Sequence, residues 1–147
     1  MELFDNVNHN LNLIKAAKKK DSLKYHSLLY GELIATVHNC GLNLICVDSN
    51  YHLDDGFEVD FSFYYHPLKV IVLNYGTINN KQLEPFHGKD FRLAYNLILI
   101  HEIGHHLAFK CNDFTENGAW RDGLNLSEYL KIFSPELTQL FRNYFIA

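Results

Sequence analysis

Two histidines and a glutamate with the spacing of a metal site occur at His101, Glu102 and His105. Residues four apart on a helix lie nearly one above the other, so both imidazoles can reach the same ion. The glutamate between them lies at the edge of that site, where its carboxylate can take a proton from water. This pattern is typical of zinc hydrolases, in which two ring nitrogens hold the metal and the carboxylate activates a water molecule.

The helix expected to carry this motif, from about Lys89 to Phe109, is apolar around almost its whole circumference, which predicts that it is buried. A buried carboxylate or unpaired imidazole costs on the order of several kcal/mol unless it is paired or bound to metal. Gly104 lies in the middle of this helix, where glycine costs about 1 kcal/mol relative to alanine. Its presence there suggests that a strand or a substrate approaches closely. The apolar residues of the helix are Leu93, Leu97, Ile98, Leu99, Ile100, Ile103 and Leu107.

A catalytic zinc ion needs a third protein ligand and leaves a fourth position for water. Glu116, at the start of the next expected helix, is the favoured third ligand. Cys111 and Asp113, in the loop after the motif helix, and Glu128, further along the next helix, are its rivals. Cys111 lies where a metzincin would have its third histidine, but Ala108 replaces the glycine which that pattern requires.

Hydrolysis of an amide also needs a donor that stabilises the oxyanion. The candidates are Tyr75, Tyr95 and His106, although tyrosines are more often core or surface residues than catalytic ones. His106 points about 100° away from His105 around the helix, which favours a supporting or surface role over ligation. A substrate can bind in extended form along the edge of the sheet.

The remaining elements are expected from the periodicity of apolar residues. Asp21 is expected to cap the second helix, and Gly41 lies just beyond its end. A long loop containing Pro85 is expected from Asn74 to Gly88. The order predicts an α+β fold, zincin-like, with a small three-stranded sheet packed on helices around the motif helix. Helices are expected over 1–20, 21–38, 116–132 and 135–145, and strands over 42–47, 57–63 and 68–73.

The composition predicts a cytoplasmic protein with a single domain over residues 1–147, in which residues 1–20 can form a peripheral helix. The chain is 48% hydrophobic, which is enough for a core, and its net charge is −4. That acidic balance and the scarcity of arginines argue against nucleic-acid binding. The three cysteines form no CxxC pair, which fits a reducing compartment. A signal pattern and an apolar run of membrane length are both lacking, so no membrane partner is expected.

The stretch from Val70 to about Leu126 resembles the ImmA/IrrE-type zinc metallopeptidases. The shared features are a strand that ends in asparagine (Val70-Ile71-Val72-Leu73-Asn74), a Phe-x-Leu-Ala run (Phe91-Arg92-Leu93-Ala94), the motif at 101–105, and a following Glu-x-x-Ala (Glu116 and Ala119).

The resemblance implies that His101, His105 and Glu116 bind Zn²⁺ and that Glu102 is catalytic. It further implies a zinc metalloendopeptidase that cleaves a regulatory protein, such as a repressor or an antitoxin, at few sites. The alternative is a catalytically silent zincin-fold module that binds a regulatory partner.

Overall fold

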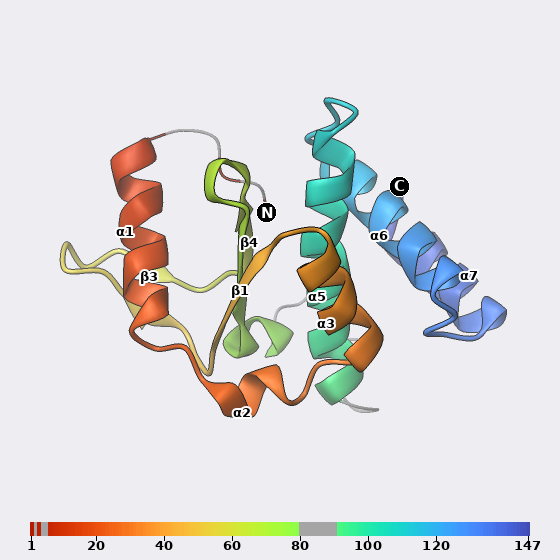
Figure 1. The fold of residues 1–147 in the computed structure, drawn as a ribbon, viewed down its shortest axis with the longest axis horizontal. Helices are drawn as coiled ribbons and strands as arrows, with labels where there is room; N and C mark the ends of the chain where they lie inside the picture. Colours follow the sequence, from red (N-terminus) through yellow and green to blue (C-terminus); the bar gives the residue numbers. More distant parts are fainter. Residues whose placement is uncertain (2, 4–5, 80–90) are drawn as a thin grey trace.

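The computed structural model describes residues 1, 3, 6–79 and 91–147 and has an α+β fold (Figure 1). Helix α1 (Val7–Lys18), the short α2 (Leu23–His26) and α3 (Gly31–Asn39) come before the first strand. The strands are β1 (Asn43–Val47), β2 (Tyr51–His52), β3 (Glu58–Val59), β4 (Phe63–Tyr65) and β5 (Val70–Asn74). Two 3-10 turns, η1 (His66–Leu68) and η2 (Tyr75–Asn79), flank β5. Helices α5 (Phe91–Phe109), α6 (Glu116–Tyr129) and α7 (Pro135–Phe145) follow.

The main sheet has three strands in the order β1-β5-β4. Strands β1 and β5 run parallel with Ile45 opposite Val72, and β4 runs antiparallel to β5 with Phe63 opposite the same valine. Strand β4 therefore lies at the edge of the sheet, and only one of its sides is paired with β5. Strands β2 and β3 form a separate antiparallel hairpin.

Alternate side chains of the sheet enter two hydrophobic cores, one on each face, as the two-residue period of a strand requires. In Figure 1, α1 covers one face, and α3 and α5 cover the other. Leu13, Ile14 and Ala17 of α1 pack with residues such as Val72 on the first face. On the second face, Ile71 packs with residues of α3, α5, α6 and α7.

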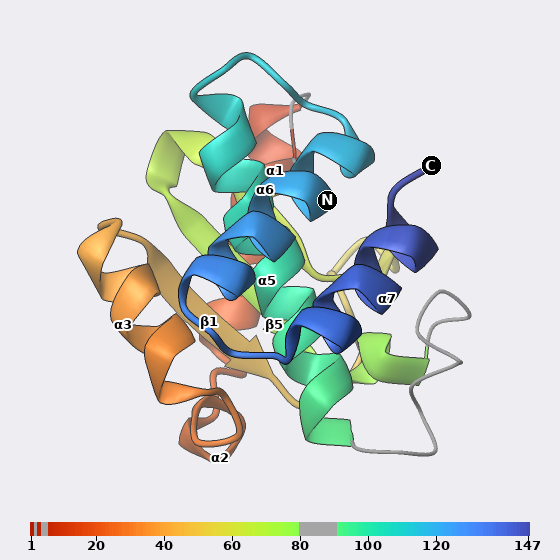
Figure 2. The ribbon, with the colours of Figure 1, turned by 90° about the vertical axis from the view of Figure 1, so that its right-hand side faces the viewer.

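Helices α5 and α6 are in direct backbone contact, and α6 and α7 lie over α5 in Figure 2. A Cβ atom at Gly104 would lie 1.9 Å from the carbonyl oxygen of Ala119, and one at Gly123 would lie 2.3 Å from the carbonyl oxygen of Ile100. The close approach expected at Gly104 therefore exists, but the partner is a helix backbone, not a strand or a substrate. The two glycines set the distance between the helices.

Replacing Gly104 with alanine is expected to lower the free energy of unfolding by about 2–3 kcal/mol, because the new methyl group forces α5 and α6 apart. This loss should exceed the gain of about 1 kcal/mol that alanine brings to a helix interior. Urea denaturation gives the measurement. Gly31→Ala is the matched control, since no heavy atom lies within 4 Å of the added Cβ. A Gly104→Ala protein as stable as the wild type would show that the helices can separate without cost.

Several sequence expectations are confirmed. Strand β1 begins one residue after the predicted start, and β5 covers most of the predicted 68–73 strand. Helix α5 ends at Phe109 as expected and is buried along most of its length. Helix α7 begins at Pro135, where the Ser134 side chain accepts a hydrogen bond from the N–H of Leu137. Gly41 has a φ of +68°, as expected for the residue beyond a helix end.

The continuous helix predicted over 21–38 is wrong, because the helix is interrupted between α2 and α3. A side chain of α5 binds the backbone of this interruption: the Asn96 amide accepts a hydrogen bond from the N–H of Tyr30 and donates one to the carbonyl of Leu28. Asp21 is not the cap either, since Ser22 holds that position. Its carboxylate instead accepts from the N–H of Cys46 in β1.

The strand predicted over 57–63 is also wrong, because only its two ends pair, in β3 and β4. Asn74 explains the interruption: its N–H donates to the Ser62 hydroxyl, and its side-chain amide donates to the carbonyl of Val59. These bonds replace a continuous ladder.

The first helix is shorter than predicted. Its buried apolar residues are Leu13, Ile14 and Ala17, while Val7 and Leu11 are exposed. Of the loop expected over 74–88, residues 75–79 form η2, while residues 80–88, together with Lys89, lie outside the described residues. In the part of the chain that is described, no helix combines the length and apolarity needed to cross a bilayer.

Candidate metal centre

The motif histidines and Glu116 come together where α5 meets the start of α6. His101 and His105 lie one turn apart on α5, and Glu116 is the first residue of α6. Thr115 caps α6 by accepting a hydrogen bond from the N–H of Gly118, which fixes where the helix begins. The helix crossing and this cap together bring the Glu116 carboxylate to the histidines.

The three ligand atoms converge on one point. Oε2 of Glu116 lies 2.6 Å from Nε2 of His101 and 3.0 Å from Nε2 of His105. If each of the three residues offers one ligand atom, these three atoms all lie within 4.8 Å of one another. Ligand atoms bound tetrahedrally to zinc at 2.0–2.2 Å lie about 3.3 Å from one another. The group could hold a metal ion, and its donor set of two imidazoles and one carboxylate suits zinc.

The protonation states favour metal binding. Burial lowers the pKa of His101, so the ring is neutral near pH 7, which is the form that binds metals. Burial opposes ionisation of Glu116, but hydrogen bonds from His101 and His105 outweigh it and lower the pKa of its carboxyl well below the usual range. The site therefore presents the anionic oxygen of Glu116 beside the neutral ring of His101.

The ring of His101 packs against an aromatic side chain of α6. Its ring centroid lies 4.3 Å from that of Trp120, which in turn stacks on Phe145 of α7 at 3.8 Å. The Nδ1 atom of His101 is buried and has no hydrogen-bond partner among the described residues. The ring orientation is thus fixed by packing against the indole, and Nε2 is the nitrogen that faces Glu116.

The rivals of Glu116 are placed elsewhere. Asp113 accepts hydrogen bonds from the N–H and hydroxyl of Thr115 and from Arg121. These contacts lower the pKa of the Asp113 carboxyl to about 2. Cys111 is exposed, and Glu128 pairs with Arg142. The structure thus groups Glu116 alone of the four candidates with the histidines, within the described residues.

Glu102 is buried, with 2% of its surface exposed. Its carboxylate accepts hydrogen bonds from the N-terminal ammonium of Met1, at 2.7 Å to Oε1 and 3.0 Å to Oε2. Sequence reasoning missed this contact, because no local pattern links two residues 101 positions apart.

The three candidate oxyanion donors lie in two places. His106 is buried, and its Nδ1 lies 2.7 Å from the Tyr64 hydroxyl, which is also 2.7 Å from Nδ1 of His66. His106 therefore ties α5 to the edge strand β4, in keeping with the supporting role expected for it. Tyr75 and Tyr95 pack on each other in the core, at 5.3 Å between ring centroids.

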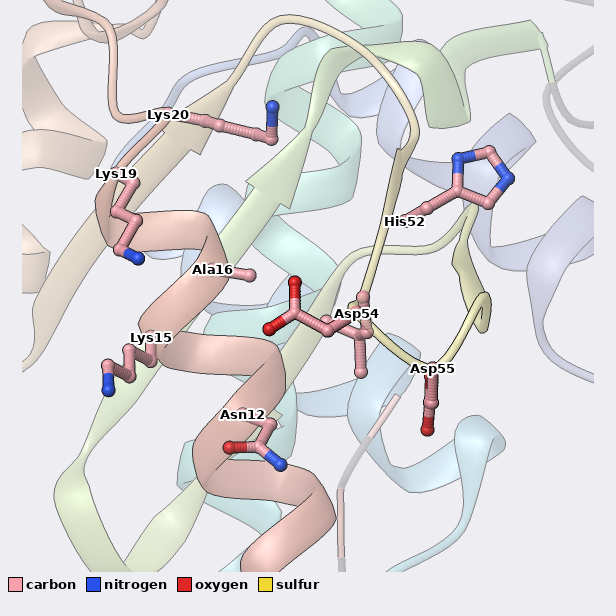
Figure 3. Close-up of a pocket in the computed structure, with 9 residues that line it drawn as sticks. Asn12, Lys15, Ala16, Lys19, Lys20, His52, Asp54 and Asp55 are labelled. Carbon is pink, nitrogen blue, oxygen red and sulfur yellow. The ribbon is translucent and has the colours of Figure 1, made fainter.

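A surface pocket of about 470 Å³ lies between α1 and the β2–β3 hairpin, away from this centre (Figure 3). None of its lining residues belongs to the metal cluster. Figure 3 shows the Asp54 carboxylate directed toward α1, while Lys15 and Lys19 extend away from the hairpin. The pocket is lined by both acidic and basic side chains, as is usual for a solvated surface. The lining residues are Asn12, Lys15, Ala16, Lys19, Lys20, His52, Leu53, Asp54 and Asp55.

Comparison of the chain with protein-family models, with curated proteins and with solved structures finds no match.

Proposed function

We propose that the chain is a zinc-dependent metalloendopeptidase with a zincin-like fold, similar in kind to the ImmA/IrrE metallopeptidases. The observation that carries the proposal is the convergence of His101, His105 and Glu116 beside the buried carboxylate of Glu102. Two helical histidines, a carboxylate from the next helix and a neighbouring glutamate are the parts that metal-assisted hydrolysis of an amide requires.

The roles of the residues follow from their positions. His101, His105 and Glu116 would hold zinc, which when bound lowers the pKa of water and polarises the carbonyl of the substrate. Glu102 takes a proton from the attacking water and delivers it to the leaving nitrogen, so a peptide bond and one water give a carboxylate and an amine. Because Glu102 is buried, little bulk water competes for its proton.

The substrate side of the proposal rests on the resemblance and on the edge position of β4. An extended segment of a regulatory protein, such as a repressor or an antitoxin, would bind along β4 in place of Met1 and Leu3, whose main chain now bonds to Tyr64. It would be cleaved at few sites in the cytoplasm. Main-chain hydrogen bonds to an edge strand supply affinity without requiring a particular sequence.

The proposal predicts stoichiometric zinc in the purified protein and hydrolysis that depends on it. Elemental analysis measures the metal, and release of labelled fragments from unfolded casein measures hydrolysis. Treatment with 1,10-phenanthroline should abolish cleavage, and added zinc should restore it. A protein that contains no metal after purification with zinc in all buffers would contradict the proposal, as would cleavage that persists after the chelator.

A further inference from the structure

Within the described part of the chain, His101 lacks the hydrogen-bond partner that usually orients a metal-binding histidine. When Nε2 of a histidine binds a metal ion, Nδ1 carries the proton, and its N–H normally donates to a carboxylate, a carbonyl or water, which fixes the ring. Nδ1 of His101 is buried, and no described residue accepts a hydrogen bond from it. The orientation of this ring therefore depends on another kind of contact.

The indole of Trp120 is in position to supply that contact. Trp120 follows Glu116 by one turn of α6, so the same face of α6 brings a candidate ligand and an aromatic ring to His101. The centroids of the indole and the imidazole lie 4.3 Å apart, with 33° between the ring planes. His105 lies edge-on to the same imidazole at 4.6 Å, but it is itself a candidate ligand. Trp120 thus contacts His101 without being part of the ligand set.

The indole is in turn held in place by two other helices. Only 3% of the surface of Trp120 is exposed, and Phe145 of α7 stacks on it at 3.8 Å with 11° between the planes. The preceding residue, Ala119, has its carbonyl oxygen against Gly104 of α5, which fixes the backbone of α6 at this point. An indole fixed by both its ring and its backbone is a rigid support for the imidazole.

The contact also favours the charge that the imidazole acquires on binding a metal ion. A bound ion withdraws electron density from the ring, which then carries part of the positive charge. An aromatic face attracts a positive charge that lies within about 6 Å of its centroid, and tryptophan attracts it more strongly than phenylalanine or tyrosine does. The His101 ring lies inside this range. Trp120 therefore stabilises the metal-bound form of His101 more than the free form.

We propose that Trp120 is a positioning residue of the metal centre, which orients His101 in place of a hydrogen-bond acceptor and strengthens zinc binding. The inference rests on the proposed function for the identity of the metal and its ligands. Trp120 acts through the imidazole of His101, so its effect is expected in the affinity for zinc, which is measured without substrate.

The test compares two replacements of Trp120. Trp120→Leu removes the aromatic face and should weaken zinc binding at least about tenfold, since loss of a group that supports a ligand costs 10–100-fold in metal affinity. Trp120→Phe keeps an aromatic face against the imidazole and should stay within about threefold of the wild type. Competition with a fluorescent zinc indicator gives the dissociation constants. Trp120→Met, whose flexible side chain fills gaps in a core, replaces the leucine variant if that protein does not fold.

The matched control is Phe141→Leu, which makes the same aromatic-to-leucine change in the same hydrophobic core. Phe141 is fully buried and packs on Phe133 at 5.1 Å and on Phe145 at 6.4 Å between ring centroids. Urea denaturation should show that both leucine variants lose stability, whereas zinc affinity should fall in Trp120→Leu only. An equal fall in both would overturn the proposal, because the effect would then be one of general destabilisation. Wild-type affinity in Trp120→Leu, or a Trp120→Phe protein as weak as Trp120→Leu, would overturn it as well.

The failure of this inference is distinguishable from failure of the proposed function. If the zinc affinities follow the expected order but the zinc-loaded wild type cleaves no casein, the metallopeptidase proposal fails while the role of Trp120 stands. If casein is cleaved and Trp120→Leu binds zinc as the wild type does, the role of Trp120 is wrong while the proposed function stands.

Discussion

Replacing Glu102 with glutamine is expected to lower kcat for casein hydrolysis by about 10²–10⁴-fold while zinc content stays unchanged. Glutamine keeps the shape of the side chain but cannot accept the proton of the attacking water, and general-base catalysis contributes an effect of this size. His101 and His105 lie on the same helix and keep their positions, so the metal should remain. The measurements are casein turnover and elemental zinc on the same samples.

The control is Glu32→Gln, which makes the same chemical change at an exposed position on α3. It should leave turnover unchanged. Glutamine at 102 also weakens the contact with the Met1 ammonium. Wild-type turnover in Glu102→Gln would assign the base to another group. A zinc-loaded wild type that cleaves nothing would favour the silent binding module.

The Glu116→Ala substitution is expected to weaken zinc binding by at least about 100-fold. Changes to groups that only support a ligand cost 10–100-fold in metal affinity, and removal of the ligand itself should cost no less. The substitution also leaves Nε2 of His101 and Nε2 of His105 without the oxygen that they now contact. Competition with a fluorescent zinc indicator measures the affinity.

Glu128→Ala is the control on the same helix, because Glu128 pairs with Arg142 at the surface. Asp113→Asn tests the other carboxylate rival. Both variants should bind zinc as the wild type does. If the Asp113→Asn protein lost zinc and the Glu116→Ala protein retained it, the third ligand would be Asp113, in the loop before α6.

The parts of the fold that could be predicted from the sequence are those with local causes. The start of helix α7 could be predicted because a serine cap is followed by proline. The burial of α5 could be predicted because its residues are apolar on all sides; both signals lie within a short stretch of sequence. The errors arose where distant side chains replaced local bonds. Asn96 takes up the backbone of Leu28 and Tyr30, and Asn74 holds the backbone of Val59, and no periodicity reveals either contact.

The candidate site divides in the same way. Helix geometry alone places His101, Glu102 and His105 together, because their spacing follows the turn of a helix. The choice of Glu116 among four candidates depends on where α6 crosses α5, and that crossing is set by contacts between Gly104 and Ala119 that come from tertiary packing. The Met1 contact depends on the path of the whole chain, so it could be found only in the structure.

The stacking of Trp120 against His101 gives the molecule an intrinsic optical probe. The chain has a single tryptophan, and its ring centroid lies 4.3 Å from that of a candidate ligand. Indole fluorescence of the unlabelled protein therefore originates beside the candidate metal centre and nowhere else. A paramagnetic ion such as Co²⁺ seated between the histidines would quench that emission at short range, so occupancy could be followed in real time without a substrate.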